Sequence, residues 1–597
     1  MAEPSPEKRI LLAFGLSFLV LVVWSSYMRT TVPRPKPARP AGGPAAPETR
    51  PAAAHPAPAV PPTQPTEAVP EQPAPPAVSE VRQGSVEHII TIETDVATIV
   101  FSTHGATVRS WRLKDFKDDA EEPVELVRSS ETHTGYPLAL ALADAAVQEK
   151  LNDALFVVDA PADTLTAPAE LVFEWSDGQL AARKRFRFER DYLLEIETEV
   201  VDAGQPLEHR LAWLGGFGEP RGQDAAYGLG AQVFVRSPAG LQRQPAGQAG
   251  QESGWLWKRP SPFPVSGEAA YAGIEDQYFV ALFLPRRPQL SAQAWTREWT
   301  PTGGKKQPVG EVAIGVANGN ALRLYVGPKD IDILKQLQAP AFPSGLQPVL
   351  ADELVDFGWF WWVAKPLFLA MKWIYEHWVA NYGWVIVLLT VIINLALFPL
   401  RWKSMQSAFK MQKVAPQIKA IQDRYKQYKF NDPRKQQMQQ EIMAVYKEHG
   451  INPLGGCLPL VFQLPFFYGF YKVVALSIEM RHAPWILWIR DLSHKDPYYV
   501  LPVTMAITMY LSMKMTPMTG ADPRQQKMMQ VMMLVFAFMF LQVSAGLVLY
   551  WLASSVVGLG QQLWINRWQH QHDQAEKEAA KHKKKKKRHQ ATEEEEA

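Results

Sequence analysis

The stretch MMQVMMLVFAFMFLQVSAGLVLYWLASSVVGLGQQLWIN, residues 528–566, runs for 39 residues without a charged side chain. As one α-helix it would measure about 58 Å, whereas the hydrocarbon core of a bilayer is only about 30 Å thick. The small residues Ser544, Ala545 and Gly546 offer a turn near its middle. The stretch therefore predicts two membrane crossings, 528–543 and 547–566, joined by a short turn.

Other apolar segments precede this stretch. They predict crossings at 383–400, 453–478 and 498–513, and the segment 378–400 contains no charged residue. Between the first two crossings, the segment 401–449 carries eleven Lys or Arg against four Asp or Glu. Apolar runs of this length, separated by a polar insert, are typical of a polytopic α-helical membrane protein.

The placement of Lys and Arg predicts the orientation, because cytoplasmic loops carry an excess of both. The insert 401–449 and the lysine-rich tail 569–597 are therefore expected in the cytoplasm. Five crossings separate the tail from the region before 383, so that region is expected outside the membrane. A further apolar run at 10–28 returns the N-terminus to the cytoplasm, which gives six spans.

The first 80 residues predict an anchor and a tether. We interpret residues 1–30 as an uncleaved transmembrane anchor; a cleaved signal peptide is the alternative, but no convincing small-x-small cleavage site follows the apolar run. Residues 31–78 hold 16 of the 49 prolines, mixed with alanine. Such a composition cannot pack a core, so 31–80 is expected to be an extended tether.

The region 81–335 has the sequence texture of β-structure. Segments such as 86–93, 96–101, 183–188 and 193–198 alternate apolar and polar residues or are β-branched, and Gly, Pro and Asp turns separate them. This pattern predicts a large all-β domain, a β-sandwich, on the periplasmic side.

The segment 354–378 is rich in tryptophan but is interrupted by Lys365, Pro366, Lys372 and Glu376. Tryptophan prefers the headgroup layer, so we interpret this segment as an amphipathic helix lying on the membrane surface. A further crossing is the alternative. The crossings that follow make 379–568 a five-span core.

The insert 401–449 contains two helical patterns on either side of 430–433. Met411, Val414, Ile418 and Ile421 form one apolar stripe, and a second comprises Met438, Ile442, Val445 and Tyr446. Asp432 and Pro433 fit the N-cap and first position of the second helix. A cytoplasmic helical hairpin that contacts a partner or substrate is expected; a solvated connector is the alternative.

Composition excludes several classes of function. The single cysteine, Cys457, rules out an intrachain disulfide, and no Cys/His cluster has metal-ligand spacing. No nucleophile–base pair, phosphate loop or cofactor motif is present, so we predict neither an enzyme nor a bound cofactor or metal. The lysines at 583–587 favour anionic lipid or ribosomal RNA as a partner, and not DNA.

Several motifs resemble those of the YidC membrane protein insertases. They are INPLGGCLPLVFQLPFF (451–467), APW (483–485), WIRDL (488–492), DPYY (496–499) and SAGLVLY (544–550). The preceding anchor, tether and β region are similar to the Gram-negative form of the family. This resemblance implies an inner-membrane insertase and folding chaperone, acting alone or with the Sec translocon on newly made integral membrane proteins.

The same resemblance implies a hydrophilic groove and a hydrophobic slide. The family's groove charge, usually arginine, aligns with Asn394, so charge attraction would here require Arg401, Lys403 or Lys514 to reach inward. Groove-lining candidates are Asn394, Thr390, Gln463 and Gln542, with Ser554, Gln561 and Gln562 as further polar candidates. Interhelical hydrogen bonding is the alternative for each.

Slide candidates are apolar residues that the resemblance places along the path of a client helix. They are Leu464, Phe467, Met505, Met539 and Trp551, the last standing where the family commonly has tyrosine. Ordinary core packing is the alternative. Nascent membrane proteins, Sec subunits, membrane lipids and, through the hairpin and basic tail, the ribosome are the expected partners. A channel or transporter, and a ligand-sensing membrane protein, are the rival functions.

Overall fold

The computed structural model describes residues 80–595 apart from 119, 129–134, 219–230, 246–268, 287–289, 300–306, 317–319, 340–348, 429–431, 433, 452–457, 516–530, 532–534 and 536–537. The predicted anchor 10–28 lies outside the described residues. So do all but the last residue of the tether 31–80 and half of the predicted crossing 528–543, namely 528–530, 532–534 and 536–537.

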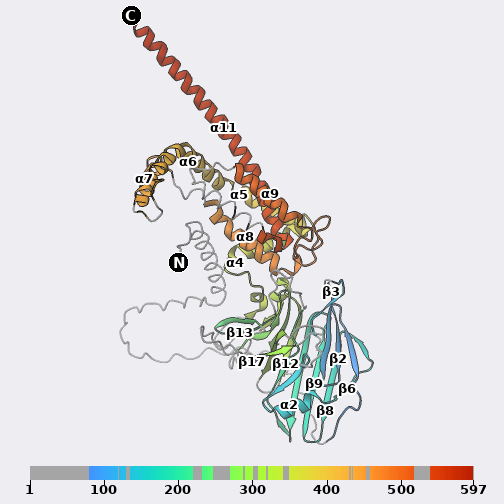
Figure 1. The fold of residues 1–597 in the computed structure, drawn as a ribbon. Coiled ribbons are helices and arrows are strands. Elements are labelled where there is room, and N and C mark those ends of the chain that lie inside the picture. The colour runs from blue at the N-terminus through green and yellow to red at the C-terminus, as the bar shows by residue number, and fades with distance from the viewer. Residues whose placement is uncertain are drawn as a thin grey trace, which may run out of the picture. The chain divides into compact units, whose positions relative to one another are not determined.

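Strands fill most of the described chain before residue 351 (Figure 1). The largest sheet has the order β14-β13-β15-β16-β19-β10-β9-β8-β6, with β11 paired to β10; two further sheets run β4-β3-β2-β1-β7 and β17-β18-β12-β5, and β20 pairs with β21. The bounds are β1 Ile89–Glu93, β2 Ala97–Ser102, β3 Thr107–Lys117, β4 Pro123–Glu125, β5 Ala139–Leu142, β6 Val157–Asp159, β7 Thr164–Thr166, β8 Ala169–Ser176, β9 Leu180–Phe188, β10 Leu193–Asp202, β11 Gln205–Pro206, β12 His209–Trp213, β13 Gln232–Ser237, β14 Gly240–Pro245, β15 Tyr271–Glu275, β16 Phe279–Pro285, β17 Leu290–Trp299, β18 Gln307–Val316, β19 Asn320–Pro328, β20 Gln338–Ala339 and β21 Val349–Leu350.

Aromatic side chains join the sheets of this β region. The ring of Phe101 on β2 lies 5.0 Å from that of Phe186 and 5.7 Å from that of Phe188, both on β9. Because these strands belong to different sheets, the two sheets face each other across a shared core, as in a sandwich. The β region extends past the predicted limit of 335, since β21 ends at Leu350.

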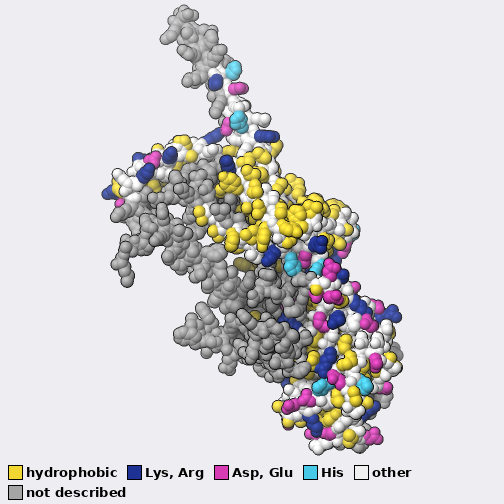
Figure 2. Space-filling model, turned by 45° about the vertical axis from the view of Figure 1, so that its right-hand side comes forward, with side chains coloured by type: hydrophobic (Ala, Val, Ile, Leu, Met, Phe, Trp, Pro, Cys, Tyr) yellow, Lys and Arg dark blue, Asp and Glu magenta, His cyan; other side chains and the backbone are white. Residues whose placement is uncertain are grey.

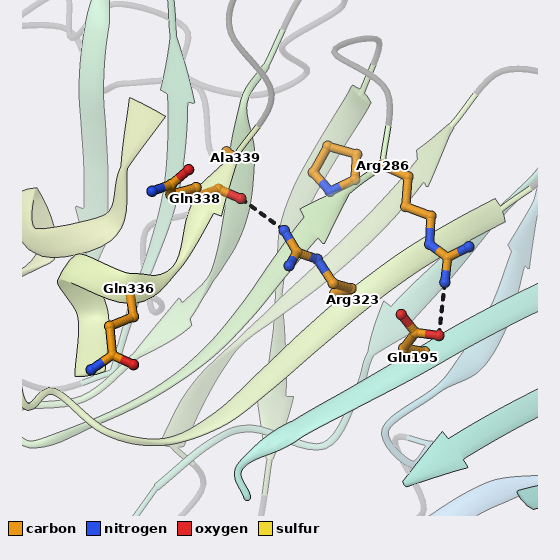
Figure 3. A pocket seen from close by; sticks show the side chains of 7 residues that line it. Glu195, Arg286, Arg323, Gln336, Gln338 and Ala339 are labelled. Atoms are coloured by element: carbon orange, nitrogen blue, oxygen red, sulfur yellow. Dashed lines mark hydrogen bonds and ion pairs between the residues drawn. The ribbon is translucent and has the colours of Figure 1, made fainter. Parts of the chain in front are cut away.

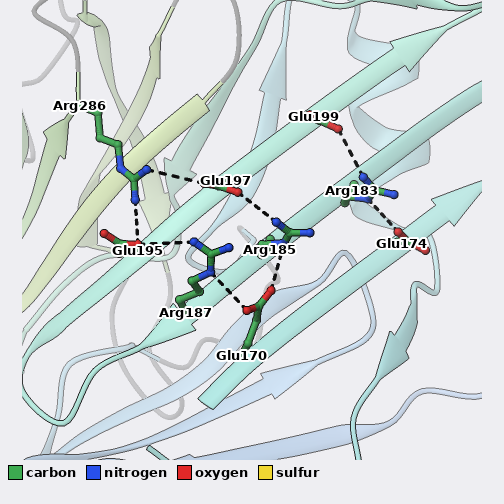
Figure 4. A network of polar contacts seen from close by, with 9 residues as sticks. All are labelled: Glu170, Glu174, Arg183, Arg185, Arg187, Glu195, Glu197, Glu199 and Arg286. Atoms are coloured by element: carbon green, nitrogen blue, oxygen red, sulfur yellow. Dashed lines mark hydrogen bonds and ion pairs between the residues drawn. The ribbon is translucent and has the colours of Figure 1, made fainter. Parts of the chain in front are cut away.

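The alternating sequences of β8, β9 and β10 place apolar residues in the core, together with the single buried charge of Lys184, and the other charges on the opposite face. On that face the arginines of β9 stand between the glutamates of β8 and β10 (Figure 4). Arg183 Nε lies 2.8 Å from Glu174 Oε1, and Arg286 Nη2 lies 2.8 Å from Glu195 Oε2. Partly exposed pairs of this kind contribute little each, but opposite charges across strands favour one register.

Helices fill the chain after residue 351, and two short ones lie within the β region. Their bounds are α2 Ala145–Asn152, α3 Ile331–Gln336, α4 Trp361–His377, α5 Tyr382–Ala396, α6 Phe398–Arg424, α7 Arg434–Glu448, α8 Leu458–Leu476, α9 Val500–Met515 and α11 Ala545–Glu595, with 3-10 turns η2 Ala351–Leu354, η4 Ile478–Met480 and η5 Phe540–Gln542. A second apolar core joins α4, α5, α8, α9 and α11, in which the rings of Phe470 and Tyr550 stack at 4.2 Å.

By length and composition, one helix among the described residues could cross a membrane by itself, over Ala545–Ala575 of α11. The pair α5 and α6 meets the same test across a bend of 56°, and α9 is a shorter apolar helix. Apolar side chains spread over the surface of the helical region, whereas charged side chains of both signs are scattered over the β region (Figure 2). The exposed apolar residues on α9 include Val503, Ile507 and Leu511.

The boundaries of three predicted segments differ in the structure. The predicted crossing 383–400 ends at Ala396, because the chain bends at Leu397 and Pro399 lies in the first turn of α6. The predicted tail 569–597 is not separate, since α11 continues through it to Glu595. Its Ala, Lys, Gln and Glu are strong helix formers, which explains the continuation. The predicted surface helix 354–378 forms α4 only from Trp361, after η2.

The two apolar stripes of the insert meet in the structure. Met411, Val414, Ile418 and Ile421 of α6 are buried against Ile442 of α7, with Met438, Val445 and Tyr446 around them. The carboxylate of Asp432 accepts a hydrogen bond from the backbone N–H of Arg434 at 2.9 Å, as an N-cap does. These helices form a hairpin that begins at Phe398, directly after α5.

Candidate functional site

Polar side chains from three helices meet at Ser554, which is buried on α11. Its hydroxyl donates to Asn394 Oδ1 of α5 at 3.3 Å and accepts from Gln463 Nε2 of α8 at 2.8 Å. Gln561, two turns further along α11, donates to the backbone oxygen of Asn394 at 3.1 Å. We call Asn394, Gln463, Ser554 and Gln561 the Ser554 cluster.

A second polar contact follows on the same helix. The amide of Gln562 receives a hydrogen bond from Ser512 Oγ of α9 at 3.0 Å and donates to the Ser512 backbone oxygen at 3.3 Å. One turn later, Asn566 Nδ2 donates to the backbone oxygen of Met515 at 3.3 Å. The polar residues of α11 thus recur at helical spacing and connect it to α5, α8 and α9.

Two acceptors in this region have no hydrogen-bond partner among the described residues. They are Gln561 Oε1 and Asn566 Oδ1, and both are buried. An unpaired buried amide oxygen costs about 1–3 kcal/mol, so such atoms are normally satisfied by water or by a bound group.

Arg401 brings a positive charge to the same helix face. Its guanidinium lies against Gly558, one turn beyond Ser554: a Cβ built at 558 would be 2.5 Å from Nη1 and 2.6 Å from Nη2. Only a residue without a side chain allows this approach. Arg401 follows the bend at Leu397, and the first turn of α6 lies against α11, where the ring of Phe398 is 5.7 Å from that of Trp564.

The other groove candidates occupy different positions. Thr390 is fully buried, and its hydroxyl donates a hydrogen bond to the backbone oxygen of Ile386 at 2.6 Å. This hydrogen bond stays within α5 and does not reach the Ser554 cluster. Gln542 is exposed in η5, just before α11 begins. Ser554 comes ten residues into α11, so the cluster lies about 15 Å further along that helix. The structure does not bring Gln542 to the cluster.

Of the five slide candidates, two are exposed, two are in contact with each other and one is buried in the core. Leu464 and Met539 are about half exposed. The Phe467 ring packs edge-on against Trp551 at 5.0 Å, and Trp551 in turn lies 5.4 Å from Phe540. Met505 has no exposed surface and belongs to the helical core.

Ser512, Asn566 and the Arg401–Gly558 contact were not identified as site features from the sequence. The spacing of 554, 558, 562 and 566, four residues each, marks one face of α11 and could have identified Gly558 and Asn566. Nothing in the sequence of α9 singles out Ser512.

A polar pocket opens on the β region (Figure 3). It is lined by Glu195, Arg286, Arg323, Gln336 and Gln338, with Pro285 and Ala339. Its arginines are already engaged: Arg286 pairs with Glu195, and Arg323 donates to the backbone oxygen of Gln338 at 2.8 Å. Among the residues that the structure describes, no group of three His, Cys, Asp or Glu could hold a metal ion.

The fold and the site define a class: a helical membrane protein with a polar cluster inside its bundle and a β-sandwich region before it. Residues 89–370 match the family described as YidC periplasmic domain, and 373–574 match 60Kd inner membrane protein. The chain is 32% identical over 582 residues to the membrane protein insertase YidC of Syntrophus aciditrophicus, covering 94% of this chain and 99% of that one. The YidC of Citrifermentans bemidjiense is 35% identical over 489 residues, 80% of this chain and 85% of the relative.

The chain therefore belongs to the YidC family of membrane protein insertases, proteins of the inner membrane. Among solved structures it is similar to an active YidC insertase with its first transmembrane domain resolved. That similarity has 18% identity and a TM-score of 0.33, and covers 81% of this chain and 94% of the other. The resemblance identified from the motifs at 451–550 is confirmed, and so is the predicted insertase function.

Proposed function

We propose that the chain inserts its clients through a hydrated groove lined by the Ser554 cluster. The observation that carries this proposal is the pair of buried oxygens on Gln561 and Asn566, which have no hydrogen-bond partner in the part of the chain that the structure describes. In hydrocarbon such atoms are costly, and they are tolerated where water or a client's polar group reaches them. The cluster would hold the polar flank of a client while that flank crosses the bilayer.

Arg401 supplies the charge that Asn394 lacks. An asparagine can only form hydrogen bonds, whereas the guanidinium over Gly558 can attract a carboxylate. At 4 Å and an effective dielectric constant of 20, two unit charges attract each other by about 4 kcal/mol. The positive charge that the family places at the position of Asn394 on α5 would thus be supplied in this chain by Arg401, in the first turn of the hairpin.

The apolar part of a client would leave along Leu464, Phe467, Met539 and Trp551. Leu464 and Met539 are exposed, and Phe467 and Trp551 pack edge-on against each other. Such residues suit a surface that different apolar helices can contact. Each Leu, Ile, Phe or Val transferred from water to the membrane centre gains about 0.3–0.6 kcal/mol. Insertion is then downhill for the apolar segment, and the groove lowers the cost of moving the polar one. Met505 would support this surface from the core.

The sidedness follows from charge. We place the hairpin of α6 and α7, both termini and the end of α11 in the cytoplasm, and the β region in the periplasm. The basic hairpin and tail would contact the ribosome and anionic lipid, and the β region or the bundle would contact Sec subunits. The exposed tryptophans of α4 suit a helix at the membrane surface, with its buried face on α8.

Cysteine labelling tests the groove. In a Cys457→Ser background, Gln561→Cys is expected to react with a small, water-soluble thiol reagent added from the cytoplasmic side. Met505→Cys is the matched control, because Met505 is fully buried in the apolar core. If Gln561→Cys is as inert as Met505→Cys in the folded protein, the groove is not hydrated and the proposal fails.

Reconstitution tests the activity that the groove would support. Purified protein in liposomes without Sec components should protect the exported tail of a short single-spanning client from protease. Deleting 411–446 is expected to stop insertion while the protein stays in the membrane. Full insertion by that variant would remove the hairpin from the proposed mechanism.

A further inference from the structure

The outer end of α8 is held by the β region. Ala475, in the last turn of α8, has a backbone oxygen that the helix itself leaves unpaired, and the Gln277 side chain donates to it. Gln277 lies in the turn between β15 and β16 and is buried. Its amide also donates to the Tyr278 hydroxyl at 3.0 Å.

The turn that carries Gln277 is braced on its own side. Asp276 Oδ1 accepts from the backbone N–H groups of Tyr278 at 2.8 Å and Phe279 at 2.7 Å. Just before it, the buried carboxylate of Glu275 lies 2.7 Å from Arg243 Nε and 3.3 Å from Lys329 Nζ. A turn fixed in this way holds Gln277 ready to donate without a large entropic cost.

The segment after α8 enters both apolar cores. Ile478, in η4, is buried in the core of the β region, and Met480, two residues later, is buried in the helical core. The guanidinium of Arg481 lies 5.6 Å from the centre of the Phe279 ring, on the same β15–β16 hairpin. Three successive contacts therefore fix the chain that leaves α8.

The other end of α8 carries the residues assigned to the client. Gln463 belongs to the Ser554 cluster, and Leu464 and Phe467 to the slide. Pro465 lies between the two halves of the helix and removes one backbone donor, which allows the first half to bend against the second. A helix that bends at one end requires its other end to be fixed if its contacts are to stay in register.

We propose that the β15–β16 turn and η4 form a dock that positions α8, so that the β region sets the geometry of the client-contacting half of this helix. Gln277 and Ile478 are its positioning residues. The role in insertion rests on the proposed function of Gln463, Leu464 and Phe467. The dock itself rests only on the contacts of Gln277, Ile478 and Arg481.

Hydrogen exchange on the full-length protein in liposomes tests the dock. Gln277→Glu keeps the size of the side chain but replaces its N–H donor with a carboxylate, so the last turn of α8 should exchange roughly tenfold faster. Gln242→Glu makes the same change on exposed β14 and should leave exchange in α8 unaltered. Ile478→Ala, which removes the side chain from the β core, gives an independent second arm and should accelerate the same amides.

The outcomes separate the dock from its role. Unchanged exchange over 470–480 in both Gln277→Glu and Ile478→Ala overturns the dock. Faster exchange together with client insertion lowered several-fold supports the whole inference. Faster exchange with insertion equal to that of Gln242→Glu overturns the positioning role. Failed labelling of Gln561→Cys counts against the groove alone, because the exchange measurement does not depend on it.

Discussion

Replacing Gly558 with alanine is expected to displace the Arg401 guanidinium without changing any charge. The new methyl carbon would lie 2.5 Å from Nη1 and 2.9 Å from Cζ, inside van der Waals contact, and the flexible arginine is the group that moves. A shift from about 4 Å to about 7 Å from a client carboxylate lowers the attraction from about 4 to about 2.4 kcal/mol at a dielectric constant of 20. The loss corresponds to roughly a 15-fold change in an equilibrium constant.

The assay compares two clients in liposomes. One carries an aspartate in its exported flank and the other an asparagine at the same position; protease protection measures the inserted fraction. Gly558→Ala should lower insertion of the aspartate client by up to roughly 15-fold and leave the asparagine client unchanged. Gly560→Ala is the matched control, because its Cβ would meet nothing within 4 Å and it lies on the same helix.

Both substitutions raise helix propensity by about 0.8–1.0 kcal/mol, so any difference between them reports on Arg401. Equal insertion of the two clients by Gly558→Ala and Gly560→Ala would refute the assignment of Arg401 to the groove.

Three other perturbations test separate parts of the structure. Ser554→Ala removes the hydroxyl between Asn394 and Gln463 and should destabilise the bundle by about 1–2 kcal/mol in thermal unfolding, whereas Ser555→Ala should not; equal melting of the two would deny the cluster a structural role. A photo-crosslinker at Leu464 should capture the apolar segment of a client and one at fully buried Met505 should not, so capture at both positions or at neither contradicts the slide. Burial lowers the pKa of Lys184, whose ammonium faces the backbone oxygens of Gly105, Ala106 and Leu138, to about 7 from 10.5. The unfolded chain therefore binds more protons than the folded one between pH 7 and pH 10.5, and the stability of the β region should rise by about 2 kcal/mol from pH 7 to pH 9, or about 4–8 °C in Tm. Lys184→Met should flatten this dependence, and a wild-type Tm that stays constant over that range would contradict it.

The sequence predicts the β region and the helical region well, because the spacing of apolar and charged residues along a segment determines whether that segment forms a strand or a helix. Glu195, Ile196 and Glu197 alternate across β10 as the pleat requires, and the stripes of α6 and α7 identify their own contact face. The YidC-type motifs from 451 to 550 predicted the family, and the comparisons confirm it.

The residues of the site were harder to predict because membrane helices lack an amphipathic pattern. In α9, Met505 is buried and Ile507 is exposed, yet both are apolar residues in an apolar helix. Hydrophobicity cannot tell which face meets lipid when both environments are apolar. Arg401 was a candidate from the sequence, but its reach depends on the bend at Leu397, which is a tertiary feature. Ile478 lies far from the strands in the sequence, and no local sequence pattern predicts that its side chain is buried in the core of the β region.

The unbroken length of α11 determines where its last residues can go. A disordered tail would carry its lysines through a wide volume, whereas a helical backbone holds this segment on one axis at a fixed distance from the bundle. The lysine-rich segment that starts at 583 begins 17 residues after Asn566, which is about 25 Å along a helix axis. The packing of Ser554 and Gln562 against neighbouring helices therefore fixes the axis on which that segment lies, and a rotation of α11 about this axis would rotate both ends together.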